Sequence, residues 1–206
     1  MESWMSRNGV FIDIHESLHS FQVVTEFLQV VERRTGILDY CNGNNTSARW
    51  IFQIYSREFI ESIASLIEHQ EGPILEVLAG DGKLTEFLES TVDRRIIATD
   101  SKKDSHDIAY PKWIIELDAL EAIERYNPSV VIMCWEPLYS DVGVNIVEEA
   151  IPLIWIGDPR KCAPESELME REHSRLYSRF AIGRYDSLRE NLFNTDIFLF
   201  NMDMKH

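Results

Sequence analysis

From residue 72 onward, short apolar runs alternate along the chain with stretches of helical period. The runs are apolar at consecutive positions, which is typical of parallel strands buried on both faces. They cover Ile74–Leu78, Ile96–Thr99, Trp113–Leu117, Val130–Trp135 and Ile151–Ile156. Between them lie the helical stretches Lys83–Glu89, Ala119–Tyr126 and Gly143–Ala150, and a loop at Ser101–Tyr110. This alternation predicts an α/β fold with a doubly wound, mostly parallel sheet.

The residues before and after this region also show regular patterns. Apolar residues at helical spacing predict one helix over Ser20–Arg34 and a second that starts from a cap at Thr46 or Ser47 and ends near His69. The link between these helices is rich in Gly and Asn, which favours a loop. After the fifth strand, the pattern predicts a helix over Glu165–Phe180 and a final edge strand within "DIFLFNMDM".

The composition narrows the choice of partners. The chain has 20 Lys and Arg against 35 Asp and Glu, a formal net charge of -15. Nucleic-acid-binding proteins neutralise phosphates with clustered basic residues, so this charge disfavours a nucleic-acid partner and favours a small molecule or a protein. No apolar run reaches the roughly 18 residues that span a bilayer, and the start lacks a signal-peptide pattern, so we expect no membrane partner. Three widely spaced cysteines favour reduced thiols and a cytoplasmic location. The oligomeric state stays open.

Candidate chemistry gathers in "GPILEVLAGDGKLTEFL", where the first strand of the sheet turns into a helix. In a doubly wound sheet, ligands bind at the carboxyl ends of the strands. Here Glu76 lies inside the first strand, Asp100 ends the second and Asp118 ends the third. A carboxylate at the first position suits a cationic group and repels pyrophosphate, and an acid at the second can accept hydrogen bonds from ribose hydroxyls. This set fits S-adenosylmethionine (SAM) better than NAD.

The segments "ILEVLAGDGKL", "IIATDSK", "IIELDALEAI" and "PSVVIMCWEPLY" resemble, in content and order, those of class I SAM-dependent methyltransferases. The resemblance covers roughly residues 46–158 and implies an N-terminal helical extension or lid over residues 1–45, followed by a Rossmann-like SAM-binding domain over residues 46–206. Family members carry an acid and then Gly-x-Gly-x-Gly in this turn. Here Gly80 and Gly82 match the second and third glycines, and Leu78 replaces the first, which we expect to keep a negative φ and pack inward.

The resemblance also implies which residues hold the cofactor. Asp100 would hold the ribose, and Asp118 with Ala119 would line the adenine site. The cofactor-binding residues expected on this basis are Glu76, Leu78, Ala79, Gly80, Gly82, Asp100, Ser101, Asp118, Ala119 and Trp135. Alternatively, the two glycines only form a tight turn and the two later acids only cap helices.

The acceptor side is expected at "CWEPLYSD", which ends the fourth strand. Glu136 is a candidate base or amine-orienting group and Tyr139 a second catalytic candidate, while Trp135 would stack on the acceptor. The sequence differs from the Asn-Pro-Pro-Tyr type of many amino-group methylases, which disfavours adenine and glutamine as acceptors. Simpler interpretations place Trp135 in the core and Glu136 at a solvated strand end. "WIGDPRKCAPES", after the fifth strand, and "GRYDSLREN", beginning at Gly183, are further candidates for the acceptor side.

Two alternative functions remain from the sequence. One is a SAM-binding or scaffolding protein on the same fold that has lost catalysis. The other is a zinc peptidase, because "HESLH" matches H-E-x-x-H, with His15 and His19 as ligands and Glu16 as base. The position so near the start and the lack of a downstream third-ligand signature disfavour this second alternative. We therefore predict no metal site, either there or in "DSHD" at residues 104–107.

Overall fold

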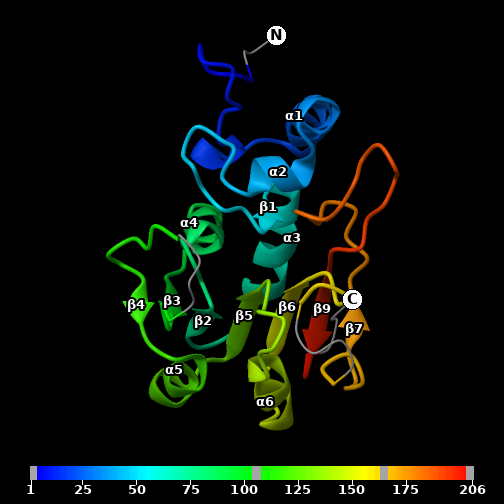
Figure 1. Ribbon diagram of the computed structural model, residues 1–206. Helices are drawn as coiled ribbons and strands as arrows, with labels where there is room; N and C mark the ends of the chain where they lie inside the picture. The colour runs from blue at the N-terminus through cyan, green and yellow to red at the C-terminus, as the bar shows by residue number, and fades with distance from the viewer. Residues whose placement is uncertain (1–3, 104–107, 163–166, 203–206) are drawn as a thin grey trace.

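The computed structural model describes residues 4–103, 108–162 and 167–202 (Figure 1). "DSHD" lies outside the described residues. Most of the described strands form one seven-stranded sheet in the order β4-β3-β2-β5-β6-β9-β7. These strands are β2 (Ile74–Val77), β3 (Ile96–Asp100), β4 (Ile115–Glu116), β5 (Val130–Cys134), β6 (Leu153–Gly157), β7 (Ser174–Arg175) and β9 (Asp196–Phe200). Five of them, β4 to β6 in that order, run parallel, and β9 is antiparallel to both of its neighbours.

The order of the strands confirms the doubly wound, mostly parallel α/β fold. The chain leaves β2, adds β3 and β4 on one side, and then returns to add β5 and β6 on the other. The winding therefore reverses between β2 and β5, which is where doubly wound sheets bind ligands.

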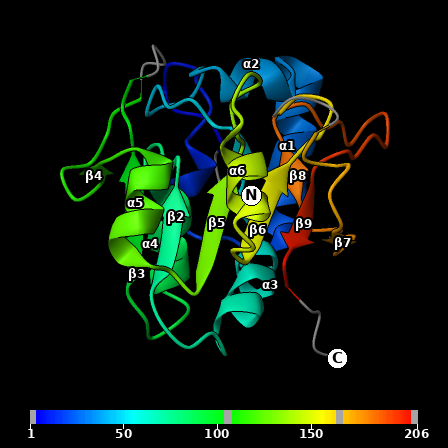
Figure 2. The same cartoon turned by 90° about the horizontal axis from the view of Figure 1, so that it is seen from below.

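Helices cover both faces of the sheet, as Figures 1 and 2 show. On one face, α3 (Arg57–Ile67) and α4 (Lys83–Glu89) pack against alternate residues of β2, β3, β5 and β6. On the other, α5 (Ala119–Tyr126) and α6 (Val142–Glu148) pack against the intervening residues, including Leu75, Val131 and Trp155. The two apolar faces of each central strand account for the unbroken apolar runs. Each helix of the described residues is too short or too polar to cross a bilayer.

A third apolar cluster lies beyond the sheet and is built largely from the amino-terminal segment. It joins the 3-10 turn η1 (Ile14–Glu16), α1 (Phe21–Arg34) and α2 (Ile37–Cys41) to a two-stranded antiparallel sheet of β1 (Gln53–Ile54) and β8 (Ile182–Gly183). Ser20 caps α1 by accepting a hydrogen bond from the Val23 N–H. The expected division at residue 45 is therefore crossed by shared packing, since Ile51, Ile54 and Ile182 belong to this same cluster.

Several expected elements differ from the structure. The predicted helix from residue 46 begins only at Arg57, with Ser56 as its cap, because the preceding residues pair with β8 instead. Within the described part of Glu165–Phe180 there is no helix; the element present is β7, which pairs with β9. Consequently β9 is an internal strand rather than an edge strand. The predicted buried strand at residues 113–117 is reduced to β4, whose two residues are exposed. The short helix α2 was not predicted.

Candidate functional site

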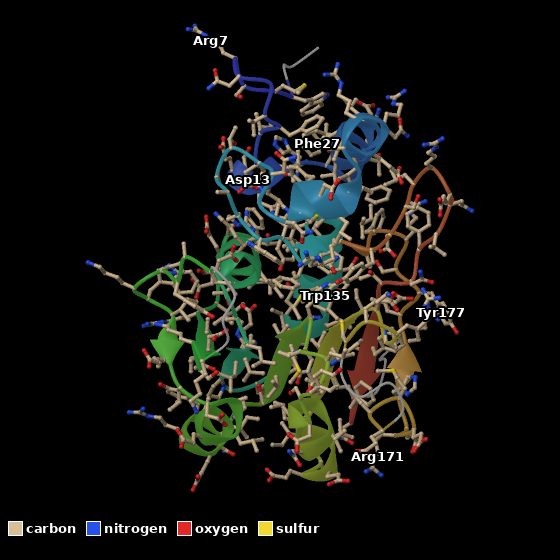
Figure 3. The ribbon with its side chains drawn as sticks, in the orientation of Figure 1. Arg7, Asp13, Phe27, Trp135, Arg171 and Tyr177 are labelled. Atoms are coloured by element: carbon tan, nitrogen blue, oxygen red, sulfur yellow. The ribbon has the colours of Figure 1, made fainter. Side chains whose placement is uncertain are left out.

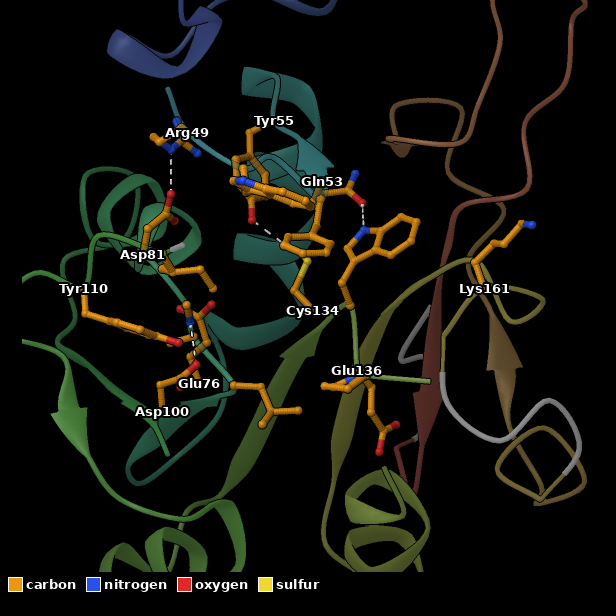
Figure 4. Close-up of a pocket in the computed structure, with 18 of the residues that line it drawn as sticks. Arg49, Gln53, Tyr55, Glu76, Asp81, Asp100, Tyr110, Cys134, Glu136 and Lys161 are labelled. Atoms are coloured by element: carbon orange, nitrogen blue, oxygen red, sulfur yellow. Dashed lines mark hydrogen bonds and ion pairs between the residues drawn. The ribbon is translucent and has the colours of Figure 1, made fainter. Parts of the chain in front are cut away.

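A pocket of about 230 Å³ lies at the carboxyl ends of β2 and β5, where the winding reverses (Figure 4). The turn after β2 and the residues that follow β5 form two of its walls, and Asp100 at the end of β3 adds a third side. Residues near β1 and β8 close it from above. The structure thus brings together seven of the sequence-predicted residues: Glu76, Leu78, Ala79, Gly80, Asp100, Trp135 and Glu136.

Glu76 is a buried carboxyl group in the floor of this pocket. Its side chain is only 2% exposed, and its Oε2 accepts a hydrogen bond from the Thr85 hydroxyl on α4. Burial raises the pKa of Glu76 from 4.5 to about 8, and the nearby carboxylates of Asp81 and Asp100 act in the same direction. Near neutral pH, the group is therefore largely protonated until a cation comes beside it. Such a partner would restore the carboxylate.

Asp100 fixes the geometry of the turn. Its Oδ2 accepts from the Gly80 N–H at 2.9 Å, and its Oδ1 accepts from the Lys102 N–H at 2.7 Å. Each carboxylate oxygen has a second lone pair, so both can still accept a hydrogen bond from a ligand hydroxyl. Tyr110 and Ile108 line the pocket on the same side and provide apolar surface for a flat ring.

Leu78 and Trp135 both adopt a left-handed backbone conformation, with φ of 54° and 61°. They follow the adjacent parallel strands β2 and β5 and line the same pocket. The expectation of a negative φ at Leu78 is therefore wrong: the turn after β2 holds this leucine in a conformation that glycine adopts more readily. A bulky residue in this region is unfavourable, and such strain gathers at functional sites.

Arg49 ties the turn after β2 to the amino-terminal segment. Its guanidinium contacts Asp81 at 2.6 Å and Asp13 at 2.9 Å, and a third nitrogen lies 3.2 Å from His15 Nδ1. Asp13 is almost fully buried, and the Arg49 side chain is 15% exposed. Arg49 lines the pocket, but its charge is already balanced by two carboxylates. It therefore shapes the pocket mouth and adds little free positive charge.

Trp135 forms the wall opposite the acids. Its indole Nε1–H donates to Gln53 Oε1 at 3.0 Å, and Gln53 in turn donates to the Ile182 carbonyl at 3.0 Å. The ring lies close to the Gly183 backbone, where a Cβ would overlap the indole. Gly183 therefore permits the close approach of Trp135. The tryptophan is 9% exposed, so it belongs both to the core and to the pocket wall.

Glu136 and Tyr139 do not form a catalytic pair. One Glu136 oxygen accepts from the Ser140 hydroxyl and the Gly143 N–H, both at 2.8 Å, and the other accepts from Trp155 Nε1 at 3.0 Å. Its carboxylate is directed toward the start of α6, away from Glu76 and Asp100 (Figure 4). Glu136 thus anchors α6 and a core tryptophan, and it is not a solvated strand end, since it is 2% exposed. Tyr139 is 95% exposed and does not line the pocket.

Four further sequence-predicted residues lie outside the residues that line the pocket. Gly82 caps α4 with φ of 72°, and a Cβ there would overlap Trp113. Asp118 caps α5 by accepting from the Leu120 N–H at 3.1 Å, and Ala119 is buried in the core beside it. Ser101 does not line the pocket. The alternative that Asp118 caps a helix is the arrangement that forms.

Other pocket residues were not predicted: Arg49, Trp50, Phe52, Gln53, Tyr55, Tyr110, Lys161 and Tyr185. Most of them come from segments brought over the sheet by the pairing of β1 with β8. Two segments gave a signal: Tyr185 belongs to "GRYDSLREN" and Lys161 to "WIGDPRKCAPES". Tyr55 is largely buried, with its hydroxyl 3.9 Å from Cys134 Sγ, and burial raises the pKa of both groups. Both therefore stay neutral at physiological pH.

The "HESLH" histidines do not share a helix. η1 ends at Glu16, and Ser17 is in an extended conformation, so His15 and His19 lack the i, i+4 geometry of a zinc helix. His15 is fully buried, and its Nε2 accepts from the Tyr55 N–H at 2.9 Å. Within the described ranges, there is no group of three His, Cys, Asp or Glu residues that could hold a metal. The zinc peptidase hypothesis therefore lacks its structural premise.

No protein-family model matches the sequence, and a search of curated proteins finds no match. Several solved structures are similar, among them the following three. One is a protein from Streptococcus mutans assigned as a SAM-dependent methyltransferase (12% identity, TM-score 0.38, 69% of this chain and 47% of that one). Another is Sp1610 of Streptococcus pneumoniae, assigned as a tRNA (m1A22) methyltransferase (16% identity, TM-score 0.38, 74% and 73%).

The third similar structure is SMU.776, assigned as a methyltransferase and solved with SAH (10% identity, TM-score 0.35, 67% of this chain and 48% of that one). The chain spans about half the length of two of these three proteins. At such low TM-scores, similarity says nothing about activity. A functional assignment for this chain depends on the residues of its own pocket.

Proposed function

We propose that this protein is a SAM-dependent methyltransferase that acts on a small-molecule or protein acceptor by direct methyl transfer. The observation that carries the proposal is the pair of carboxyl groups, Glu76 and Asp100, at the ends of the adjacent strands β2 and β3 in one pocket. An adenosyl sulfonium amino acid has an ammonium group for the first and ribose hydroxyls for the second. The site lies where doubly wound sheets bind nucleosides.

The charges of the pocket favour this ligand over a dinucleotide. Glu76, Asp81 and Asp100 line the side nearest the turn, and the cation closest to them, Arg49, already pairs with Asp81. A pyrophosphate would meet carboxylates without a free positive charge, which is costly in a partly desolvated site. A cationic ligand without phosphate is instead attracted by these carboxylates.

In this role, each residue has a defined task. Glu76 would pair with the ligand ammonium, Asp100 would accept from the ribose hydroxyls, and Tyr110 would flank the adenine. When bound, SAM would supply an already activated methyl group. The chain then has to align the acceptor and exclude water, which is the work of a closed wall such as that of Trp135. Because Glu136 is engaged with α6, alignment carries more of the catalysis than proton removal by a strand-end acid.

Calorimetry of the full chain tests the proposal. We expect SAM and its demethylated product to bind with one-to-one stoichiometry, and NAD to bind at least 100-fold more weakly. Incorporation of labelled methyl groups into a fraction of small molecules or proteins then demonstrates the transferase. Binding without incorporation would instead support the inactive SAM-binding protein. Preference for NAD, or no nucleoside binding at all, would overturn the assignment.

A further inference from the structure

The half of the pocket that faces away from Glu76 is lined by aromatic rings. Trp135, Phe52, Trp50 and Tyr185 line it, and Trp135 lies 5.8 Å from Tyr185 and 6.4 Å from Phe52 between ring centroids. Tyr185 is 39% exposed, so part of its face is open to a ligand. Rings at these distances contact one another, and together they form an aromatic surface on which another flat ring can stack or make an edge contact. We call this group the aromatic slot.

The aromatic slot has its own positive charge. Lys161 lines the pocket, and its Nζ lies 5.3 Å from the centre of the Tyr185 ring. No carboxylate pairs with Lys161 among the residues that the structure describes. Among the described residues, the other cation that lines the pocket is Arg49, which forms ion pairs with two acids. Lys161 is thus the positive charge most available to a ligand.

A second cation lies behind the rings. Arg184 is 4% exposed, and its guanidinium lies 4.6 Å from the centre of Phe52 and 5.3 Å from that of Trp50. It donates to Asn42 Oδ1, but its Nε has no hydrogen-bond partner in the described structure, nor does any described carboxylate form an ion pair with it. Burial therefore lowers the pKa of Arg184. Its charge adds to the positive potential on this side.

The pocket is therefore divided by charge: Glu76, Asp81 and Asp100 lie on the side of β2 and β3, and Lys161 lies with the aromatic rings on the other side. Glu136 also lines that second side, but its carboxylate is hydrogen-bonded to Ser140, Gly143 and Trp155. From this division we infer that the methyl acceptor is a small aromatic acid, a flat ring that carries one negative charge such as a carboxylate. This inference rests on the proposed function, which assigns the acidic half of the pocket to SAM and leaves the aromatic half for the acceptor. The ring would lie in the aromatic slot against Trp135 and Tyr185, with its charge near Lys161. A nucleic acid is disfavoured, because one free lysine cannot neutralise a chain of phosphates.

Binding of four small probes to the full chain, in the presence of SAH, tests this inference. The probes are benzoate, its neutral amide, benzylamine and cyclohexanecarboxylate. The affinity of each is measured by ligand-observed NMR. We expect benzoate to bind at least threefold more tightly than the amide and the saturated acid, and benzylamine to bind weakest. Equal binding of benzoate and the amide, or tighter binding of a single-stranded oligonucleotide, would overturn the inference.

Variants separate charge from shape. Lys161→Met should weaken benzoate at least threefold and leave the amide unchanged, whereas Lys112→Met, which removes an exposed lysine outside the pocket, should change neither. Tyr185→Leu should weaken the binding of both benzoate and its amide. If Lys161→Met behaves like Lys112→Met, the inference is wrong. The affinity for SAM, measured separately, should be the same in all three variants. If the parent protein binds benzoate but does not bind SAM, the proposed function is rejected and the aromatic slot is retained.

Discussion

The Trp135 indole N–H donates to Gln53 Oε1 at 3.0 Å, and this bond joins the end of β5 to the small sheet of β1 and β8. The end of β5 and the segment that closes the pocket are therefore connected through Trp135, which lies between the sheet and the amino-terminal segment (Figure 3). Gln53 is 2% exposed, so the bond is shielded from water and its loss would leave a buried donor unsatisfied. The position of Trp135 depends on residues far from it in sequence.

Gly183→Ala should disturb this wall. The added Cβ would overlap the indole of Trp135 and the hydroxyl of Thr195, so the ring has to move. We expect a loss of about 1–3 kcal/mol in the free energy of unfolding, measured by urea titration, and a shifted indole N–H resonance. In a background of Trp135→Phe, the same alanine should cost clearly less. Equal costs in the two backgrounds would show that the overlap is relieved elsewhere.

The left-handed conformation at Leu78 predicts an unusual order of stabilities. Leu78→Gly removes the strain, whereas Leu78→Ala keeps it, and both remove the same packing beyond Cβ. The glycine variant should therefore be about 1 kcal/mol more stable than the alanine variant. Thermal and urea unfolding measure the difference. At a position with negative φ, alanine would be the more stable of the two.

Glu76 should make stability depend on pH. Its pKa is raised by burial to about 8, so the folded state holds a proton that the unfolded state releases above about pH 4.5. The contribution is fully present below pH 4.5 and is lost as pH rises toward 8, at most about 5 kcal/mol in total. Glu76→Gln should therefore gain stability relative to the parent between pH 5 and pH 8.5. A constant difference across this range would contradict the raised pKa.

His15 should have the opposite effect on the acidic side. Burial lowers the pKa of His15 well below 6.5, with Arg49 as the next cause, so the unfolded state binds a proton that the folded state excludes. Stability should fall as pH drops below 6.5. His15→Gln, which keeps an acceptor for the Tyr55 N–H, should flatten this decline. Urea unfolding of both proteins between pH 5 and pH 7 measures the difference between their stabilities, to which Glu76 contributes equally in each and therefore cancels. A difference that stays constant over this range would refute the prediction.

Asp100 and Asp118 should differ in their effect on the cofactor. Asp100→Asn removes the charge beside the pocket and should weaken SAM at least tenfold by calorimetry. Asp118→Ser keeps the cap of α5, and because Asp118 does not line the pocket, SAM affinity should stay within threefold. If Asp118→Ser weakened SAM as much as Asp100→Asn, the adenine role that the sequence implies for Asp118 would be restored.

Local patterns were sufficient for the central sheet and its helices. The bounds of α4 and α5 agree with the prediction, as do those of the four central strands to within one or two residues, because burial on both faces leaves an unbroken apolar run. Ile51 and Ile54, in contrast, have helical spacing but pair with or pack beside β8. Gln53 donates a hydrogen bond to Ile182, 129 positions away in the sequence. The residues around Gln53 contain no pattern that predicts this distant partner.

The acidic half of the site could be predicted, but the aromatic half could not. Glu76 and Asp100 lie at strand ends, where topology brings them together whatever the loops do. Lys161 and Tyr185 reach the pocket through the loops after β6 and β8, and the sequence marks these segments as candidates without showing the course of either loop. The conformation of Leu78 was missed for another reason: side-chain chemistry predicts a negative φ, and the fold around the turn overrides that preference.

A single guanidinium, that of Arg49, holds both Asp13 and Asp81. A ligand that restricts the motion of the turn after β2 therefore also restricts Asp13, through the ion pairs of Arg49. Backbone amides around Asp13 should therefore exchange with solvent more slowly once a ligand fills the pocket. Hydrogen exchange near the amino terminus would then report whether the pocket is occupied.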